Sequence, residues 1–231
     1  MGTLKKIVIL HGWTYSLEKW SKFTNLLSRD GFEVYLPKIP GLTQESDASW
    51  DLEKYSSWLN KELESYKDKI TLLGHSHGGR IAINYAVKHP DKLQKLILID
   101  SAGIFHNELP IRLKRLLFKN ISKVGKKFTK SDTLRKILYK FAREGDYENA
   151  SANMKKTINN LISTDLKPEL GKIKTPTLII WGENDKITPL KDGYLMNKLI
   201  SGSKLEVIKG ARHSPFFTNS DEVVKIIKND I

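Results

Sequence analysis

The chain has 231 residues, of which 39% are hydrophobic and 28% are charged, and its formal net charge is +13. This composition is typical of a globular protein, the length fits one domain with an insertion, and no apolar run is long enough to span a bilayer. The absence of cysteine excludes disulfides, thiolate nucleophiles and cysteine-ligated metals. We expect a soluble, cytoplasmic protein, since no signal peptide is recognisable.

Short apolar runs alternate with longer amphipathic stretches along the chain. Apolar runs without polar alternation are typical of parallel strands that are covered on both faces. We predict six buried strands, at residues 6–10, 33–36, 70–73, 96–99, 178–181 and 205–208. Helical patterns lie at residues 17–28, 49–66, 79–88, 190–200 and 220–227. This order predicts an α/β fold with a doubly wound, mostly parallel sheet of about six strands.

The alternation is interrupted once, between residues 100 and 177. Three amphipathic helical patterns fill this interval. Their apolar positions are Leu113, Leu116, Leu117, Ile121, Val124 and Phe128; Leu134, Ile137, Leu138 and Phe141; and Met154, Ile158, Leu161 and Ile162. We interpret the interval as an inserted all-helical cap. The predicted organisation is a core part at residues 1–102, the cap at 103–168 and a second core part at 169–231.

Most of the net positive charge lies in this predicted cap. Residues 103–167 contain fifteen lysines and arginines against six acidic residues. Such a patch could attract anionic substrates, a membrane surface or nucleic acid. No nucleic-acid-binding motif accompanies the charge. We therefore favour solvated, lysine-rich helix faces, with no nucleic-acid partner and at most a weak contact with an anionic surface.

The strongest motif is Gly74-His75-Ser76-His77-Gly78-Gly79, directly after the predicted strand at 70–73 and directly before a helix. This is the G-x-S-x-G nucleophile elbow in the strand–turn–helix setting that it requires. A tight turn of this kind lifts the serine hydroxyl out of the fold, and side chains at the positions of Gly74 and Gly78 would collide with the neighbouring chain. The motif predicts that Ser76 is a catalytic nucleophile.

A serine nucleophile needs a base that is held by a third group. In the chain order Ser, Asp or Glu, His, the acid follows a late strand and the histidine follows the last one. Asp185 fits the acid best, Glu183 is the nearest competitor and Asp100 is a weaker one. His213 lies in the loop after the strand at 205–208. We predict a catalytic triad of Ser76, Asp185 and His213.

Two further segments are expected to support this chemistry. His11, Gly12 and Trp13 follow the first strand, where a glycine lets the backbone turn its next amide toward the serine. We predict an oxyanion hole made by the amides of Trp13 and His77. No metal is expected, because His75 and His77 point in different directions from the elbow and no carboxylate cluster accompanies them.

Together, these motifs resemble the α/β-hydrolase superfamily. The resemblance rests on His11-Gly12, on residues 74–79, on Gly182 with Asp185 and Pro189, and on Gly210 with His213. It implies a hydrolase with a helical lid, no cofactor and a small-molecule substrate, similar to small bacterial carboxylesterases and meta-cleavage product hydrolases. In one respect the chain differs, because it begins almost at the strand that precedes the His-Gly pair and lacks the two strands that most members carry before it.

The expected function is cleavage of a carboxylic ester, or a related acyl bond, through an acyl-enzyme intermediate. One alternative is a carbon–carbon bond hydrolase that uses the same triad. That alternative predicts polar or cationic cap residues that point into the pocket, and the candidates are Arg112, Arg115, Arg135 and Arg143. The other alternative is a non-catalytic small-molecule receptor on the same fold.

Overall fold

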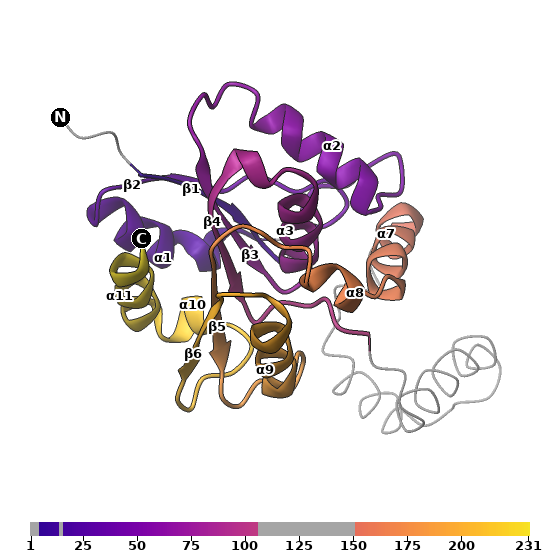
Figure 1. Cartoon of the computed structure of the whole chain (residues 1–231). Coiled ribbons are helices and arrows are strands. Elements are labelled where there is room, and N and C mark those ends of the chain that lie inside the picture. Colours follow the sequence, from indigo (N-terminus) through magenta and orange to yellow (C-terminus); the bar gives the residue numbers. More distant parts are fainter. Residues whose placement is uncertain (1–4, 14–15, 106–150) are drawn as a thin grey trace, which may run out of the picture.

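The computed structural model describes residues 5–13, 16–105 and 151–231, which contain one parallel sheet with helices on both faces (Figure 1). Its six strands lie in the order β2-β1-β3-β4-β5-β6, and every neighbouring pair is parallel. The predicted fold class is confirmed. The strands are β1 (Lys5–Leu10), β2 (Phe32–Tyr35), β3 (Ile70–His75), β4 (Leu93–Ile99), β5 (Thr177–Gly182) and β6 (Lys204–Ile208).

The winding direction of the chain reverses between β1 and β3. From β1 the chain moves outward to β2, then returns to pair β3 with the other side of β1 and continues to β6. In open sheets of this kind, ligands bind at the carboxyl ends of the strands where the direction reverses. The segments that follow Leu10 and His75 meet at that point, because Leu10 pairs with Gly74 in the register of the two strands.

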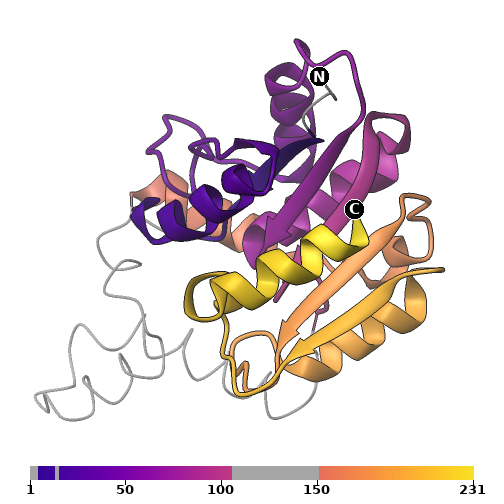
Figure 2. The ribbon, with the colours of Figure 1, turned by 90° about the vertical axis from the view of Figure 1, so that its left-hand side faces the viewer.

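Alternate side chains of the central strands enter two different cores. On one face, Ile7 and Ile9 pack with helices from both ends of the chain, and on the other face Val8 and Leu10 pack with the middle helices. Both sets are fully buried, as a parallel sheet covered on two sides requires. Figure 2, turned from Figure 1, shows the C-terminal helix crossing the strands on the first of these faces.

The helices follow the predicted pattern, with boundaries shifted by a few residues. Covering the first face are η1 (Glu18–Trp20), α1 (Ser21–Arg29), α10 (Pro215–Thr218) and α11 (Ser220–Asp230). The opposite face carries α2 (Leu52–Glu62), α3 (His77–Lys88), α7 (Ala152–Ser163), α8 (Lys167–Leu170) and α9 (Leu190–Leu199). A short turn, η2 (Pro90–Lys92), leads into β4. Among the helices described, none has the length and apolar character needed to cross a membrane.

The expectation of six buried strands is wrong for the two edges of the sheet. In β6, Lys204, Glu206 and Val207 are exposed and only Ile208 is buried. In β2, only Phe32 is buried. β2 and β6 are the two edges of the sheet, and each has a neighbouring strand on one side only. Their residues are therefore less enclosed than those of the central strands. The short apolar runs at 33–36 and 205–208 could not reveal this, because strand position depends on pairing with residues far away in sequence.

Of the predicted cap, only residues 103–105 and 151–168 lie in the described part of the chain. The first two amphipathic patterns and all four cap arginines fall outside the described residues, as does most of the basic patch. The third pattern forms α7, in which Met154, Ile158 and Leu161 are buried. The helix is joined to the loop before α2: Thr157 Oγ1 accepts the Trp50 amide at 2.9 Å. The boundaries of the cap at 103 and 168 remain a prediction.

This anchoring of α7 is testable by substitution. Thr157 is fully buried, and Thr157→Val would leave the Trp50 amide without its acceptor. An unsatisfied buried donor costs about 1–3 kcal/mol, so we expect the free energy of unfolding in urea to fall by that amount. Thr157→Ser keeps the hydroxyl and is the matched control. A loss of stability in Thr157→Ser but not in Thr157→Val would show that the methyl contacts, and not the hydrogen bond, hold α7.

Candidate active site

Ser76 lies in the turn between β3 and α3, with no loop on either side. Its backbone has φ 53° and ψ −119°, a conformation that L-residues rarely adopt. Three backbone hydrogen bonds hold it there. The Ser76 amide donates to Ile99 O at 3.3 Å, and its carbonyl accepts from Gly79 N and Ala102 N, both at 3.0 Å. The strain is therefore fixed by β4, the neighbouring strand, and by the first turn of α3.

The glycines of the elbow are required by close backbone packing. A Cβ atom at Gly78 would lie 1.9 Å from the Leu10 carbonyl oxygen, and one at Gly74 would lie 2.7 Å from the Ala82 Cβ. The Leu10 oxygen belongs to the backbone of β1 and the Ala82 Cβ is bonded directly to the backbone of α3, so neither can move without shifting a strand or helix. The steric reason given for the G-x-S-x-G spacing thus has a direct counterpart in the structure.

His213 and Asp185 form a hydrogen-bonded pair from two separate loops. The Asp185 loop follows β5 and the His213 loop follows β6, and His213 Nδ1 lies 2.7 Å from Asp185 Oδ2. The side chain of Asp185 is fully buried and that of His213 is 14% exposed. Because a carboxylate can only accept a hydrogen bond, Nδ1 of His213 carries the proton. Nε2 is then the nitrogen that is able to accept a proton.

Asp185 is ionised despite its burial. Burial opposes the charge, but hydrogen bonds from His213, Thr188 and the Ile187 amide outweigh it, and the pKa of Asp185 is lowered from its ordinary value. Thr188 Oγ1 donates to Oδ2 at 2.6 Å, and the Ile187 amide donates to Oδ1 at 2.7 Å. The competitor Glu183 is turned away, since it accepts the Gly210 amide at 2.8 Å.

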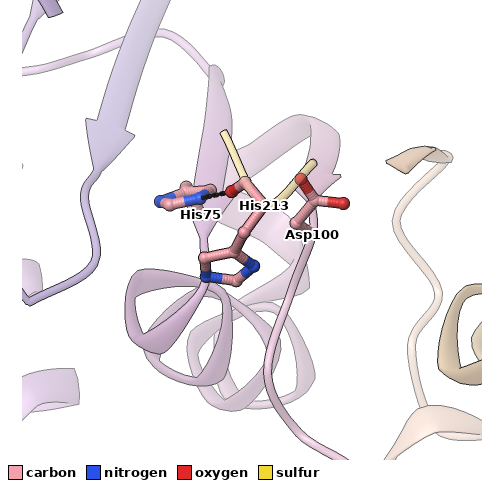
Figure 3. A group of neighbouring side chains, drawn as sticks. All are labelled: His75, Asp100 and His213. Carbon is pink, nitrogen blue, oxygen red and sulfur yellow. Dashed lines mark hydrogen bonds between the residues drawn. The ribbon is translucent and has the colours of Figure 1, made fainter. Parts of the chain in front are cut away.

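His75, the residue before Ser76, joins the elbow to the loop of His213. Its Nε2 donates to the His213 carbonyl oxygen at 2.8 Å, and the two imidazole rings lie 5.0 Å apart (Figure 3). Trp20 and Phe216 contact the same ring edge-on. Burial, followed by the neighbouring His213, lowers the pKa of His75 to about 3, so the ring stays neutral. The hydrogen bond from His75 to the histidine loop was not predicted from the sequence.

The segment after β1 lies beside the serine. A Cβ at Gly12 would be 3.0 Å from Ser76 Cβ and 3.4 Å from Ser76 Oγ, so a larger residue here would press against the serine side chain. His11 holds the turn: its Nδ1 donates to Gly12 O at 2.6 Å, and its Nε2 accepts the Ile39 amide at 3.4 Å. Burial lowers the pKa of His11 to about 4, so this ring too is neutral.

His77 begins α3, where the first amides of a helix have no partner within the helix. Burial is the main cause that lowers the pKa of its side chain to about 3, and the charges of Arg80 and His213 contribute. Its Nδ1 is buried without a hydrogen-bond partner among the described groups. Trp13 is partly buried and packs against the core that contains Leu10. The predicted oxyanion donors are thus on the two segments that border Ser76.

The carboxyl group of Asp100 lies close to His75 and His213. The donor atoms of His75, Asp100 and His213 are within 4.8 Å of one another, a grouping that could suggest a metal site (Figure 3). Both imidazoles are already engaged, through His75 Nε2 and His213 Nδ1. Burial raises the pKa of Asp100 to about 8, so it is a poor anionic ligand at neutral pH. This arrangement fits a hydrogen-bonded cluster better than a set of metal ligands.

Comparisons with known proteins agree with this geometry. The model of the family described as "Serine aminopeptidase, S33" (Hydrolase_4) matches residues 3–220. The chain is 25% identical to the 2-hydroxy-6-oxo-6-phenylhexa-2,4-dienoate hydrolase of Burkholderia cepacia, over 95% of this chain and 85% of that protein. It is 26% identical to the pimeloyl-[acyl-carrier protein] methyl ester esterase of Legionella pneumophila (strain Paris), over 93% and 90%. MenH from S. aureus has a similar structure, with a TM-score of 0.72 at 26% identity over 99% of this chain and 94% of that one.

The bond from His75 to the His213 loop gives a prediction that does not depend on catalysis. His75→Leu fills the site but leaves the His213 carbonyl unpaired, so we expect unfolding free energy to fall by about 1–3 kcal/mol. Amide hydrogen exchange in residues 209–214 should become faster. His75→Gln keeps an N–H donor and should preserve much of the protection. If both variants exchange like the wild type, the bond does not hold the loop.

Proposed function

Since the chain belongs to the α/β-hydrolase superfamily, we propose that it is a serine hydrolase that cleaves a carboxylic ester or a related acyl bond. The observation that supports this most is the 2.7 Å hydrogen bond between His213 and an ionised Asp185, in a loop that His75 ties to the strained nucleophile position. A purely structural role would require neither the strain at Ser76 nor an imidazole with one nitrogen held and the other available.

In the proposed mechanism, His213 Nε2 removes the proton from Ser76 Oγ as the oxygen attacks the substrate carbonyl. The imidazolium that forms is stabilised by Asp185 through Nδ1–H. His213 then passes its proton to the leaving alcohol, and the acyl group stays on Ser76. A water molecule, deprotonated by the same nitrogen, attacks the acyl-enzyme, and return of that proton to Ser76 releases the acid.

We assign the oxyanion hole to the amides of Trp13 and His77. The close approach of Gly12 to Ser76 Oγ supports this assignment, because it puts the start of one segment next to the reacting oxygen. His77 contributes the positive end of α3. Loss of one such donor typically costs about 3 kcal/mol of transition-state stabilisation.

The first prediction concerns the nucleophile. A fluorophosphonate probe should label the wild-type protein covalently and not Ser76→Ala, as read by intact mass. Hydrolysis of p-nitrophenyl acetate should fall by about 10⁴-fold or more in Ser76→Ala, as expected for loss of a triad member. Ser101, which is also buried, is the control, and Ser101→Ala should still be labelled. A wild-type protein that resists the probe and hydrolyses no ester would favour the receptor alternative.

A carbon–carbon bond hydrolase is the second candidate, because the relative from Burkholderia cepacia is named a 2-hydroxy-6-oxo-6-phenylhexa-2,4-dienoate hydrolase and matches 95% of this chain. The two functions differ in their preferred substrate. We expect kcat/KM on the best p-nitrophenyl ester, from acetate to palmitate, to exceed that on 2-hydroxy-6-oxo-6-phenylhexa-2,4-dienoate by about tenfold or more. Steady-state assays of both substrate classes on one preparation measure this ratio, and the reverse order would assign the chain to carbon–carbon cleavage.

A further inference from the structure

Asp100 is a buried acid that the proposed mechanism does not use. It follows the last residue of β4 and has a positive φ of 41°, one of two such non-glycine residues in the described chain. The side chain has no exposed surface. A strained backbone and a buried ionisable group are both unfavourable, so their coincidence beside a reactive site suggests a function.

The hydrogen bonds of Asp100 join the end of β4 to the end of β5. Its amide donates to Ile180 O at 3.0 Å, and its Oδ1 accepts the Gly182 amide at 2.8 Å. Its carbonyl oxygen accepts from Thr188 Oγ1 at 3.1 Å, a hydroxyl that also contacts Asp185. Asp100 therefore braces both ends of the loop that carries Asp185.

The second carboxyl oxygen of Asp100, Oδ2, differs from Oδ1 in its hydrogen bonding. Oδ2 is buried and receives no hydrogen bond from any donor in the described part of the chain. The titratable groups around it are His75 from β3, His213 from the loop after β6, and Asp185 from the loop after β5. His75 is neutral and Asp185 is negative, so these two neighbours provide no positive charge for a second carboxylate.

Two carboxyl groups that share a buried site cannot readily both be charged, and their environments decide which one keeps the proton. Asp185 receives hydrogen bonds from His213, Thr188 and a backbone amide, which lower its pKa. For Asp100, burial has the largest effect. Burial is opposed by the hydrogen bond from the Gly182 amide and reinforced by the charge of Asp185 and a hydrogen bond with its side chain, and together they raise the pKa of Asp100 to about 8.

We propose that Asp100 is a positioning residue of the acyl transfer, a neutral carboxylic acid that holds Asp185 in place to accept the hydrogen bond of His213. The proposal rests on the proposed function, because it assigns Asp185 the role of orienting the catalytic histidine. Protonation turns the orphan oxygen into a donor whose natural acceptor is the neighbouring carboxylate. Asp185 then carries the only negative charge of this carboxyl pair, next to the imidazole of His213.

The first test compares two variants in an ester assay. Asp100→Asn imitates the protonated acid, because its oxygen can accept the Gly182 amide and its NH₂ can donate toward Asp185, and Asn tolerates a positive φ. Asp100→Ala removes both contacts. We expect kcat at pH 7 to fall about tenfold or more in Asp100→Ala with little change in KM, and Asp100→Asn to recover most of the loss. Equal losses in both would contradict a neutral role.

The pH profile distinguishes positioning from simple support of the fold. In the wild type, kcat should decline above about pH 8, because loss of the Asp100 proton places a second charge beside Asp185. Asp100→Asn has no proton to lose at that position, so its kcat should stay level to higher pH. An alkaline decline of the same midpoint in both proteins would overturn the proposal.

A second measurement needs no enzymatic activity. Because the pKa of Asp100 rises from 3.8 unfolded to about 8 folded, folding takes up a proton between these values, and wild-type stability falls as pH rises through this range. Asp100→Asn takes up no proton at this position when it folds, so it lacks this pH dependence of stability. Its Tm relative to wild type should therefore rise from pH 4 to pH 8 and then level off. A constant Tm difference would refute the neutral acid, whether or not the protein cleaves esters. A missing ester activity with the expected Tm trend would refute the proposed function, and with it the positioning role, while the neutral acid would stand.

Discussion

The site depends on one constraint, the absence of space around the turn that carries Ser76. The first turn of α3 is pressed against the end of β1 so closely that one additional carbon at Gly78 would overlap the Leu10 carbonyl. The same closeness brings Gly12 to the serine hydroxyl. Because β1 and β3 are adjacent and parallel, these contacts fall at the reversal of the sheet, and His75 at the end of β3 is hydrogen-bonded to the loop after β6.

Burial around this turn controls which groups are charged. The imidazoles of His11, His75 and His77 all have pKa values lowered by burial and remain neutral at physiological pH. Asp185 is the exception among the buried acids there, because its hydrogen bonds outweigh its burial. The result is a single fixed negative charge next to His213, which is the arrangement that favours a transient imidazolium.

Much of this could be predicted from the sequence, because local patterns determine it. The elbow motif stands between a strand and a helix, and the order of Ser76, Asp185 and His213 along the chain matches the order of the loops that hold them. The choice of Asp185 over Glu183 also agrees with the hydrogen bonds of the two side chains. The catalytic roles of these residues remain proposals.

Sequence patterns could not predict the long-range contacts of the site. Nothing near His75 signals that its ring will meet a carbonyl 138 residues away, and nothing near Asp100 signals that its oxygen will be left beside Asp185. The exposure of β6 was missed for the same reason, since an edge strand is defined by its neighbours. A buried histidine next to the nucleophile and an aspartate at a strand end were the available signals for the first two.

The central claim is that the hydroxyl, imidazole and carboxylate of three distant residues act in series. A crystal structure of the protein after reaction with a fluorophosphonate tests it most directly. The account predicts phosphorus bonded to Ser76 Oγ, a phosphonyl oxygen about 3 Å from the amides of Trp13 and His77, and His213 Nε2 directed at the adduct while Nδ1 stays on Asp185. An adduct on another residue, or an imidazole of His213 turned away from the phosphonyl group, would contradict it.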